Sequence, residues 1–210
     1  AANICPGGGG GANITGPPAA DPATGVIFIA SMSGCSPTTL APAAERDTPQ
    51  MTGKTLAQWI STHEPSRPAP PMAGDPLAGI PDIFKGPIGR ITAIDLNTGE
   101  HLWMIPYGDM AQGQQDAFRN NPLLKGVTVD TNWGRRGTAA MAATSTLLFS
   151  AGQTADNKPN LFAIDKKTGK RLAAIPTPRL GAYGLMTYMH AGKQYILMPV
   201  TGGYQTLALP

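Results

Sequence analysis

One five-residue pattern occurs three times in this chain and limits what the chain can fold into. Asp-x-x-Thr-Gly stands at residues 21–25, 95–99 and 165–169. The aspartate side chain accepts hydrogen bonds from backbone amides two residues on, and the glycine supplies the positive φ that returns the chain antiparallel. Each copy therefore predicts the tip of a β-hairpin.

The residues around these turns favour β-strands. Apolar and β-branched runs flank them at residues 26–30, 90–94, 101–105, 160–164 and 170–175. The second and third turns are both preceded by Ala-Ile and followed by Leu and then Ile-Pro at matching positions. The two hairpins are therefore predicted to be built alike.

Further strands complete larger units. The pair 138–142 and 147–151 precedes the third turn, which makes a meander of about forty residues, the size of a propeller blade. A strand near 14–20 completes an earlier unit, and strands at 185–189, 194–200 and 204–209 begin a later one. We predict an all-β fold, a partial β-propeller of about two and a half four-stranded blades.

This reading divides the chain into four parts. Residues 1–108 form a blade with a long Pro-rich insertion at 36–87, residues 109–133 connect blades, 134–178 form a complete blade, and 179–210 form a partial C-terminal blade. Short helices are predicted at 54–63 and as an alternative to a turn at 109–120. Because propellers use about four to eight blades, the chain is expected to be part of a larger propeller or to need a partner chain.

Composition agrees with short strands and many turns. With 26 glycines, 21 prolines and 14% charged residues, the chain does not resemble a helical bundle. The net charge is +3 without a run of five like charges, which argues against a nucleic-acid arm or a polybasic membrane patch. No apolar stretch approaches the roughly 18 residues of a membrane span, and the N-terminus lacks the residue order of a signal peptide.

Cys5 and Cys35 are the only cysteines, and neither has a Cys or His neighbour at zinc-like spacing. A single disulfide, and hence an oxidising compartment, is the simpler interpretation. Two free structural thiols are the alternative.

Several segments together resemble the C-terminal region of quinoprotein dehydrogenases that use pyrroloquinoline quinone (PQQ). They are Gly11-Ala12-Asn13, residues 20–28, residues 93–103, Trp133-Gly134, Met186-Thr187-Tyr188 and residues 192–195. They occur in the family's order and cover residues 11–30 and 88–204, whereas the insertion is unmatched. The run from Trp103 to Asp109 is similar to the membrane-type glucose and polyol branch.

The resemblance implies an eight-bladed periplasmic propeller with PQQ buried on its axis and a calcium or lanthanide ion beside it. In that chemistry the metal polarises the C5 carbonyl, a carboxylate takes the substrate hydroxyl proton, and hydride moves to C5. It implies oxidation of alcohols, sugars or polyols, with electrons passed to ubiquinone or a cytochrome. The other partners are the remaining blades. The family's catalytic and metal-binding residues belong to earlier blades, so none is assigned to this chain.

Two places match cofactor contacts of the family. Asn13 stands where an asparagine reaches the quinone, and its amide both donates and accepts hydrogen bonds. The alternative for Asn13 is an asparagine that satisfies a turn. Trp133 with Gly134 matches a Trp-Gly beside the cofactor, since glycine permits a close backbone approach. The alternative is an inter-blade core tryptophan. Arg135 and Arg136 follow. An arginine there would either meet a cofactor carboxylate bidentately or face solvent, and we expect solvent.

Other reactive side chains are assigned structural roles. His63, His101 and His190 have no partner at metal-ligand spacing, and Met186, Met189 and Met198 are expected in the core. Two functional alternatives stay open. One is a non-catalytic propeller of the same repeat family that acts as a periplasmic assembly or interaction scaffold, and the other is an isolated fragment that binds nothing.

Overall fold

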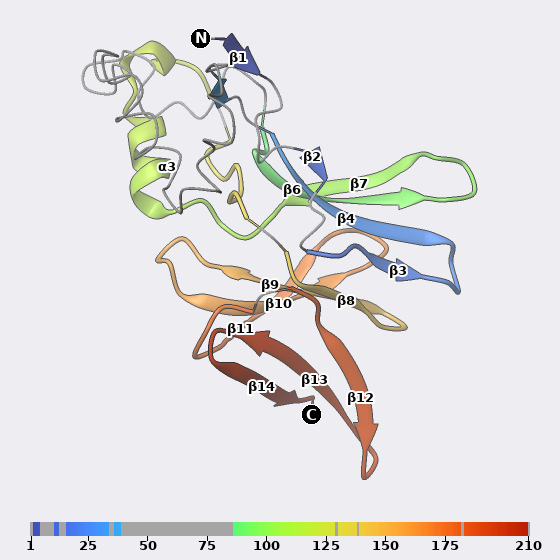
Figure 1. Ribbon diagram of the computed structural model, residues 1–210. Coiled ribbons are helices and arrows are strands. Elements are labelled where there is room, and N and C mark those ends of the chain that lie inside the picture. Colours follow the sequence, from blue (N-terminus) through green and yellow to red (C-terminus); the bar gives the residue numbers. More distant parts are fainter. Residues whose placement is uncertain are drawn as a thin grey trace, which may run out of the picture.

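Three antiparallel sheets follow one another along the chain and stack in sequence order (Figure 1). The computed structural model describes residues 2–4, 11–12, 16–33, 36–38, 86–128, 130–137, 139–181 and 183–209. A small separate sheet pairs β1 (Ala2–Ile4) with β5 (Ser36–Thr38). Apart from β5 and residues 86–87, the insertion predicted at 36–87 lies outside the described residues, as does the helix predicted at 54–63.

Each of the three stacked sheets is built from hairpins. The first sheet has the order β2-β4-β6-β7, and β3 also pairs with β4; its strands are β2 (Gly11–Ala12), β3 (Ala19–Asp21), β4 (Val26–Met32), β6 (Gly89–Asp95) and β7 (His101–Pro106). The second has the order β11-β10-β9-β8; its strands are β8 (Met141–Ala143), β9 (Leu147–Gln153), β10 (Pro159–Asp165) and β11 (Arg171–Pro176). The third has the order β12-β13-β14; its strands are β12 (Met186–His190), β13 (Lys193–Val200) and β14 (Gly203–Ala208).

The three predicted turns are confirmed in their detailed geometry. In each, an aspartate carboxylate oxygen accepts from the backbone N–H two residues later, at 3.2 Å for Asp21, 2.7 Å for Asp95 and 3.0 Å for Asp165. The closing glycines have φ of 70°, 78° and 73°. These values lie in the left-handed region that glycine enters without steric cost.

The hydrophobic core is divided into two layers, one on each face of the second sheet. Alternate residues of β9 and β10 point to opposite faces, as the pleat requires. Leu148 and Phe162 pack toward the first sheet with Phe28 and Ile91. On the other face, four residues of the second sheet pack against Ile196 and Met198 of β13; they are Phe149, Ala151, Leu161 and Ala163. Sheets packed face to face in sequence order confirm the predicted partial propeller.

The turn at 165–169 is held by the first sheet at two points. The Trp103 indole N–H on β7 donates to the Lys166 carbonyl at 3.0 Å. The Lys166 ammonium forms a buried ion pair with Asp21, at the end of β3, and donates to the Thr144 carbonyl at 2.9 Å. The first two sheets are therefore joined by directed polar contacts as well as by the core.

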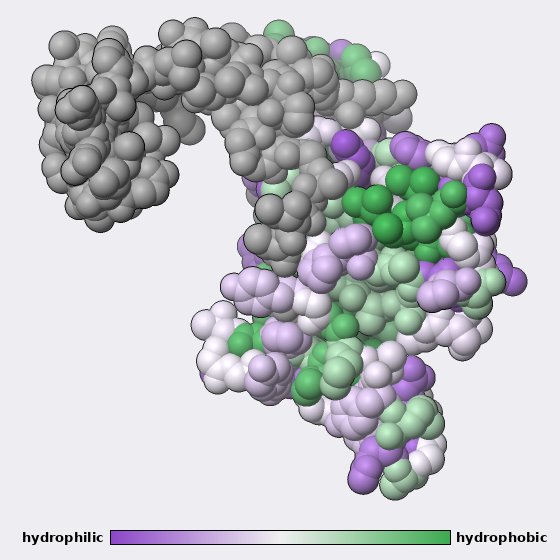
Figure 2. Space-filling model, turned by 45° about the vertical axis from the view of Figure 1, so that its right-hand side comes forward, coloured by the Kyte–Doolittle hydropathy of each residue, from purple (hydrophilic) through white to green (hydrophobic). Residues whose placement is uncertain are grey.

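The outer faces of the stack differ from the inner ones. On the first sheet Leu102 and Met104 are 49% and 44% exposed, and on the third sheet Met186 and Tyr204 are 52% and 73% exposed. Figure 2 shows apolar side chains gathered over the first sheet, at the upper right. Within the described part of the chain, only the second sheet has another sheet packed on both faces. This arrangement is that of consecutive blades without their outer neighbours.

The structure shows the conformation of the segment 109–120 and the burial of the three methionines. The segment 109–120 contains α3 (Gln112–Arg119), followed by a 3-10 turn at Pro122–Leu124. Met198 is buried as predicted, but the prediction was wrong for Met186 and Met189, which are 52% and 66% exposed. Both lie on β12, an edge strand, whereas Met198 lies on the central strand β13. Among the described residues, no helix is long and apolar enough to cross a membrane.

Candidate functional site

Of the residues singled out by sequence, Trp133, Gly134 and Arg135 lie on one connector, which runs from the end of β7 to the start of β8. It carries α3 and returns along the end of the first sheet through residues 130–137. Three cavities border this returning segment, of about 430 Å³, 270 Å³ and 240 Å³. Trp133 lines the first and Arg135 the last, so the connector shapes both of these.

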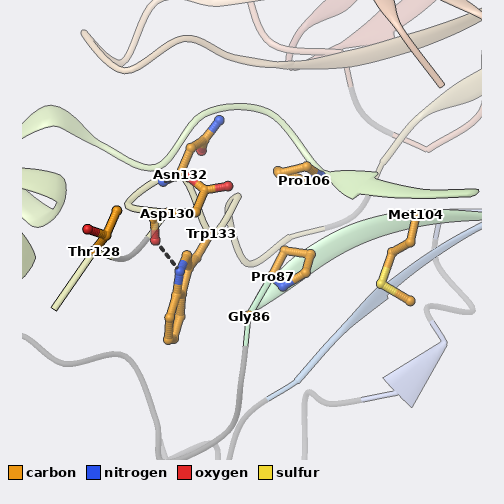
Figure 3. A pocket seen from close by; sticks show the side chains of 8 residues that line it. All are labelled: Gly86, Pro87, Met104, Pro106, Thr128, Asp130, Asn132 and Trp133. Atoms are coloured by element: carbon orange, nitrogen blue, oxygen red, sulfur yellow. Dashed lines mark hydrogen bonds between the residues drawn. The ribbon is translucent and has the colours of Figure 1, made fainter.

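The larger cavity, here called the Trp133 pocket, opens between the connector and the first sheet (Figure 3). Its lining residues are Gly86, Pro87, Met104, Pro106, Thr128, Asp130, Asn132 and Trp133. Among these described residues there is no Lys, Arg or His, and Asp130 is the one ionisable side chain. The pocket therefore offers an aromatic face, an amide and a carboxylate.

Trp133 is held in place by protein contacts. Its indole N–H donates to the Asp130 carbonyl at 2.5 Å, as the dashed line in Figure 3 marks. Its ring lies against Phe118 of α3, with centroids 4.8 Å apart, and a Cβ added at Gly86 would come within 2.6 Å of it. These contacts explain a tryptophan at this position without a ligand.

Gly134 permits the close approach of two backbones. Its φ is +71°, and an added Cβ would lie 2.1 Å from the Gly89 carbonyl oxygen at the start of β6. The neighbouring Trp133 carbonyl accepts from the Ile88 and Gly89 amides at 2.7 and 3.2 Å. Any L side chain here would force the connector away from the sheet. A cofactor role for Trp133 and Gly134 stays a prediction.

Arg136 is exposed as expected, whereas Arg135 is partly buried and held by protein contacts, so for Arg135 the prediction was wrong. The Arg135 guanidinium donates to the carbonyls of Asp109 and Thr154 at 2.6 and 2.9 Å, and to the Asn157 side chain at 2.8 Å. Burial lowers the pKa of Arg135, and the nearby carboxylate of Asp109 opposes that shift. The partners come from two loops, the one after β7 and the one between β9 and β10, so no local pattern in the sequence could indicate them.

The smaller cavity, here called the arginine pocket, lies where the ends of all three sheets meet. Its lining residues are Tyr107, Arg135, Arg136, Gly137, Gln153, Leu180, Gly181 and Thr201. Burial raises the pKa of Tyr107 to about 12, with Arg135 acting in the opposite direction, so the phenol is protonated at neutral pH. This pocket combines positive charge with hydrogen-bond donors.

Asp109 and Asn132 are central to this region and were missed as site residues. The Asn132 side-chain oxygen accepts from the Met110 and Gly134 amides at 2.9 and 3.3 Å, and its NH₂ donates to Asp109 at 3.0 Å. The sequence held one signal for Asp109. It is a polar residue directly after the Pro-Tyr-Gly that ends the hairpin, and polar residues at the end of a strand are candidates for a site.

The other predicted positions give no site. Asn13, Cys5 and Cys35 lie outside the described residues, as does His63. His101 and His190 are exposed on β7 and β12. In the described part of the chain, no three His, Cys, Asp or Glu side chains are grouped as a metal site would need.

Comparison with known proteins identifies the family. The model of the PQQ family described as "Glucose/ethanol/alcohol dehydrogenase, beta-propeller domain" matches residues 1–196. The chain is 32% identical over 129 residues to the glycerol dehydrogenase large subunit of Gluconobacter thailandicus, and 30% identical over 129 residues to that of Gluconobacter oxydans (strain 621H). Each match covers 60% of this chain and 16% of the relative.

The family match covers most of the chain, and the stacked hairpin sheets agree with it. The resemblance inferred from the turns and the Trp-Gly segment is thereby confirmed. This chain belongs to the PQQ-dependent glucose/ethanol/alcohol dehydrogenase family and forms part of its β-propeller domain.

Proposed function

We propose that the chain supplies the C-terminal blades of a PQQ-dependent dehydrogenase that oxidises an alcohol, sugar or polyol. The observation that carries the proposal is the family match over residues 1–196, supported by two relatives named glycerol dehydrogenase large subunits. When bound, the quinone would accept the hydride removed from the carbon that carries the substrate hydroxyl.

The two pockets differ in how well they suit this cofactor. PQQ is a planar, carbonyl-rich tricarboxylate, so it needs countercharge and hydrogen-bond donors. Among the described residues of its lining, the Trp133 pocket has a carboxylate and no cationic side chain, which does not fit such an anion. The arginine pocket fits it by charge, since Arg135 and Arg136 face the cavity together with Gln153.

The chain's own residues would bind and orient the quinone. Arg136 and Arg135 would attract a carboxylate edge, and the Gln153 amide could donate to a carbonyl. The protonated Tyr107 would add no negative charge beside them. Trp133 would act indirectly, because its ring packs on Phe118 and keeps the returning connector against α3.

Several parts of the proposal depend on residues outside this chain. The substrate base and the ligands of a calcium or lanthanide ion are assigned to other blades, which would also be partners of this chain. Ubiquinone or a cytochrome as electron acceptor and a periplasmic location are proposed from the family resemblance. The relatives' name, large subunit, supports a further partner subunit.

Reconstitution tests the function. The complete protein is incubated with PQQ and calcium, and the quinone absorbance and dye-linked oxidation of glycerol, ethanol and glucose are measured. We expect quinone uptake and oxidation of at least one substrate. A folded protein without quinone uptake would reject the enzyme and favour the non-catalytic scaffold.

Charge variants test the pocket. Arg136→Gln should weaken quinone binding by about tenfold, the loss expected for one charge-assisted contact. The matched control is Lys170→Gln, which should leave binding unchanged. Lys170 is an exposed basic residue directly before β11 and is not among the residues that line the pocket. Equal binding by both variants would remove Arg136 from the proposed contacts.

A further inference from the structure

Asp109 stands where four parts of the structure meet. Its backbone N–H donates to the Gln153 carbonyl at 2.9 Å, and its carbonyl accepts from Arg135 Nε at 2.6 Å. Its carboxylate accepts from both terminal nitrogens of Arg171, at 2.9 and 3.0 Å, and from Asn132 Nδ2 at 3.0 Å. One residue thus joins the exit of β7, the end of β9, strand β11 and the returning connector.

Arg171 gives Asp109 a rigid support. The guanidinium lies 4.0 Å from the centroid of the Phe162 ring, and Phe162 is fully buried between the first two sheets. A guanidinium stacked on a ring and paired bidentately with a carboxylate has little freedom to move. The Asp109 carboxylate is therefore fixed relative to the second sheet.

Asn132 transmits that position to the connector. Its side-chain oxygen already accepts from two backbone amides, Met110 and Gly134, so its NH₂ must face Asp109. The amide cannot flip without losing both of those bonds. The Asp109 carboxylate thereby orients Asn132, which in turn holds the segment that carries Trp133 and Arg135.

We propose that Asp109 is a positioning residue that sets the returning connector, and with it the Arg135 and Arg136 side of the arginine pocket, against the second sheet. Asp109 is not among the residues that line either cavity, so it acts through Asn132 and Arg135, which are. Its effect on quinone binding rests on the proposed function, whereas its effect on the connector does not.

The test uses Asp109→Asn in the complete protein. The aspartate carboxylate accepts from both Arg171 and Asn132, whereas an asparagine side chain has one oxygen and can accept from only one side. Its NH₂ group would then face the donor of the other residue. Hydrogen exchange at the amides of Met110 and Gly134 should accelerate about tenfold, while the amides of β9 and β10 keep their protection. The quinone dissociation constant should rise about tenfold as Arg135 loses its place.

The matched control is Asp116→Asn. Asp116 lies on α3 in the same connector, but its ion pair with Arg119 is within the helix and exposed. This variant should change neither the exchange at Gly134 nor quinone binding. Arg171→Lys gives a second variant, because lysine keeps the charge without the bidentate geometry, and it should act in the same direction with a smaller effect.

The outcomes separate the inference from the proposed function. If the unaltered protein binds no quinone, the proposed function fails, and the exchange rates still test Asp109. Unchanged exchange at Met110 and Gly134 in Asp109→Asn would overturn the inference. It would also be overturned if β9 and β10 lost protection equally, or if exchange accelerated while quinone binding, present in the unaltered protein, stayed the same.

Discussion

The hairpins β6–β7 and β10–β11 share their turn, register and irregularity, yet their surroundings differ. Ala93 lies opposite Trp103 in the first, and Ala163 lies opposite Ala173 in the second, with a register shift after the alanine in both. Trp103 reaches the second sheet and donates to Lys166. Ala173 has no side chain that could reach a neighbour in this way.

The turns of these two hairpins also differ in how deeply their residues are buried. Leu96 follows the aspartate of the first hairpin and is 61% exposed, whereas Lys166 at the matching position is 6% exposed and paired with Asp21. Nothing lies within 4 Å of a Cβ added at Gly99, but one added at Gly169 would lie 2.9 Å from the Trp103 ring. Turns with the same motif are thus exposed at the tip of a hairpin in the first sheet and packed against the neighbouring sheet in the second.

The largest effect is expected from breaking the ion pair at the packed turn. Lys166→Met leaves the Asp21 carboxylate buried without its cation and should lower the free energy of unfolding by about 3 to 5 kcal/mol. Leu96→Met, at the same position of the free turn, should change it by less than about 0.5 kcal/mol. Urea denaturation measures both. Similar values for the two variants would contradict the difference drawn between the turns.

Removing the tryptophan should have the next largest effect. Trp103→Ala loses ring burial against Phe28, 5.6 Å away between centroids, and the bond to Lys166, at a cost of about 3 kcal/mol. As a comparison, Leu172→Ala on β11 removes a side chain that is 54% exposed and should cost less than about 1 kcal/mol. Equal losses would show that Trp103 does not join the sheets.

The two closing glycines allow a matched comparison. Gly99→Ala should cost about 1 to 2 kcal/mol, because alanine is strained at positive φ. Gly169→Ala carries the same strain and adds the clash with Trp103, so it should cost about 1 to 3 kcal/mol more. In a Trp103→Ala background the difference between the two should shrink. A difference that persists there would place its cause elsewhere.

The smallest effect concerns pH. Hydrogen bonds from Lys166 and Thr24 hold the pKa of Asp21 below its usual value near 3.8. The unfolded state then binds more protons than the folded state in acid, so stability present above about pH 4 is lost as pH falls through the folded pKa. Asp21→Asn should therefore flatten the decline in unfolding free energy below pH 4. An unchanged decline would remove Asp21 as its source.

The sequence predicted the features that depend on short segments of the chain, namely turns and strands. The three turns and the strands at 26–30, 90–94 and 160–164 were found where they were expected, and together with Trp103 and Trp133-Gly134 they indicated the family. It failed for Arg135, whose partners come from two loops distant in sequence, and for Met186 and Met189, whose strand lies at a sheet edge. The site role of Asn13 lies outside the described residues, and that of Trp133 stays a prediction.

Local sequence alone determined the hairpins, because a turn depends on the φ of one glycine and on bonds between residues two or three positions apart. Tertiary structure decided which of the turns is buried. The Asp21 and Lys166 side chains that meet there are 145 residues apart, and no local pattern links them. It also decided that Arg135 turns inward, since burial and ion pairing depend on which sheets become neighbours.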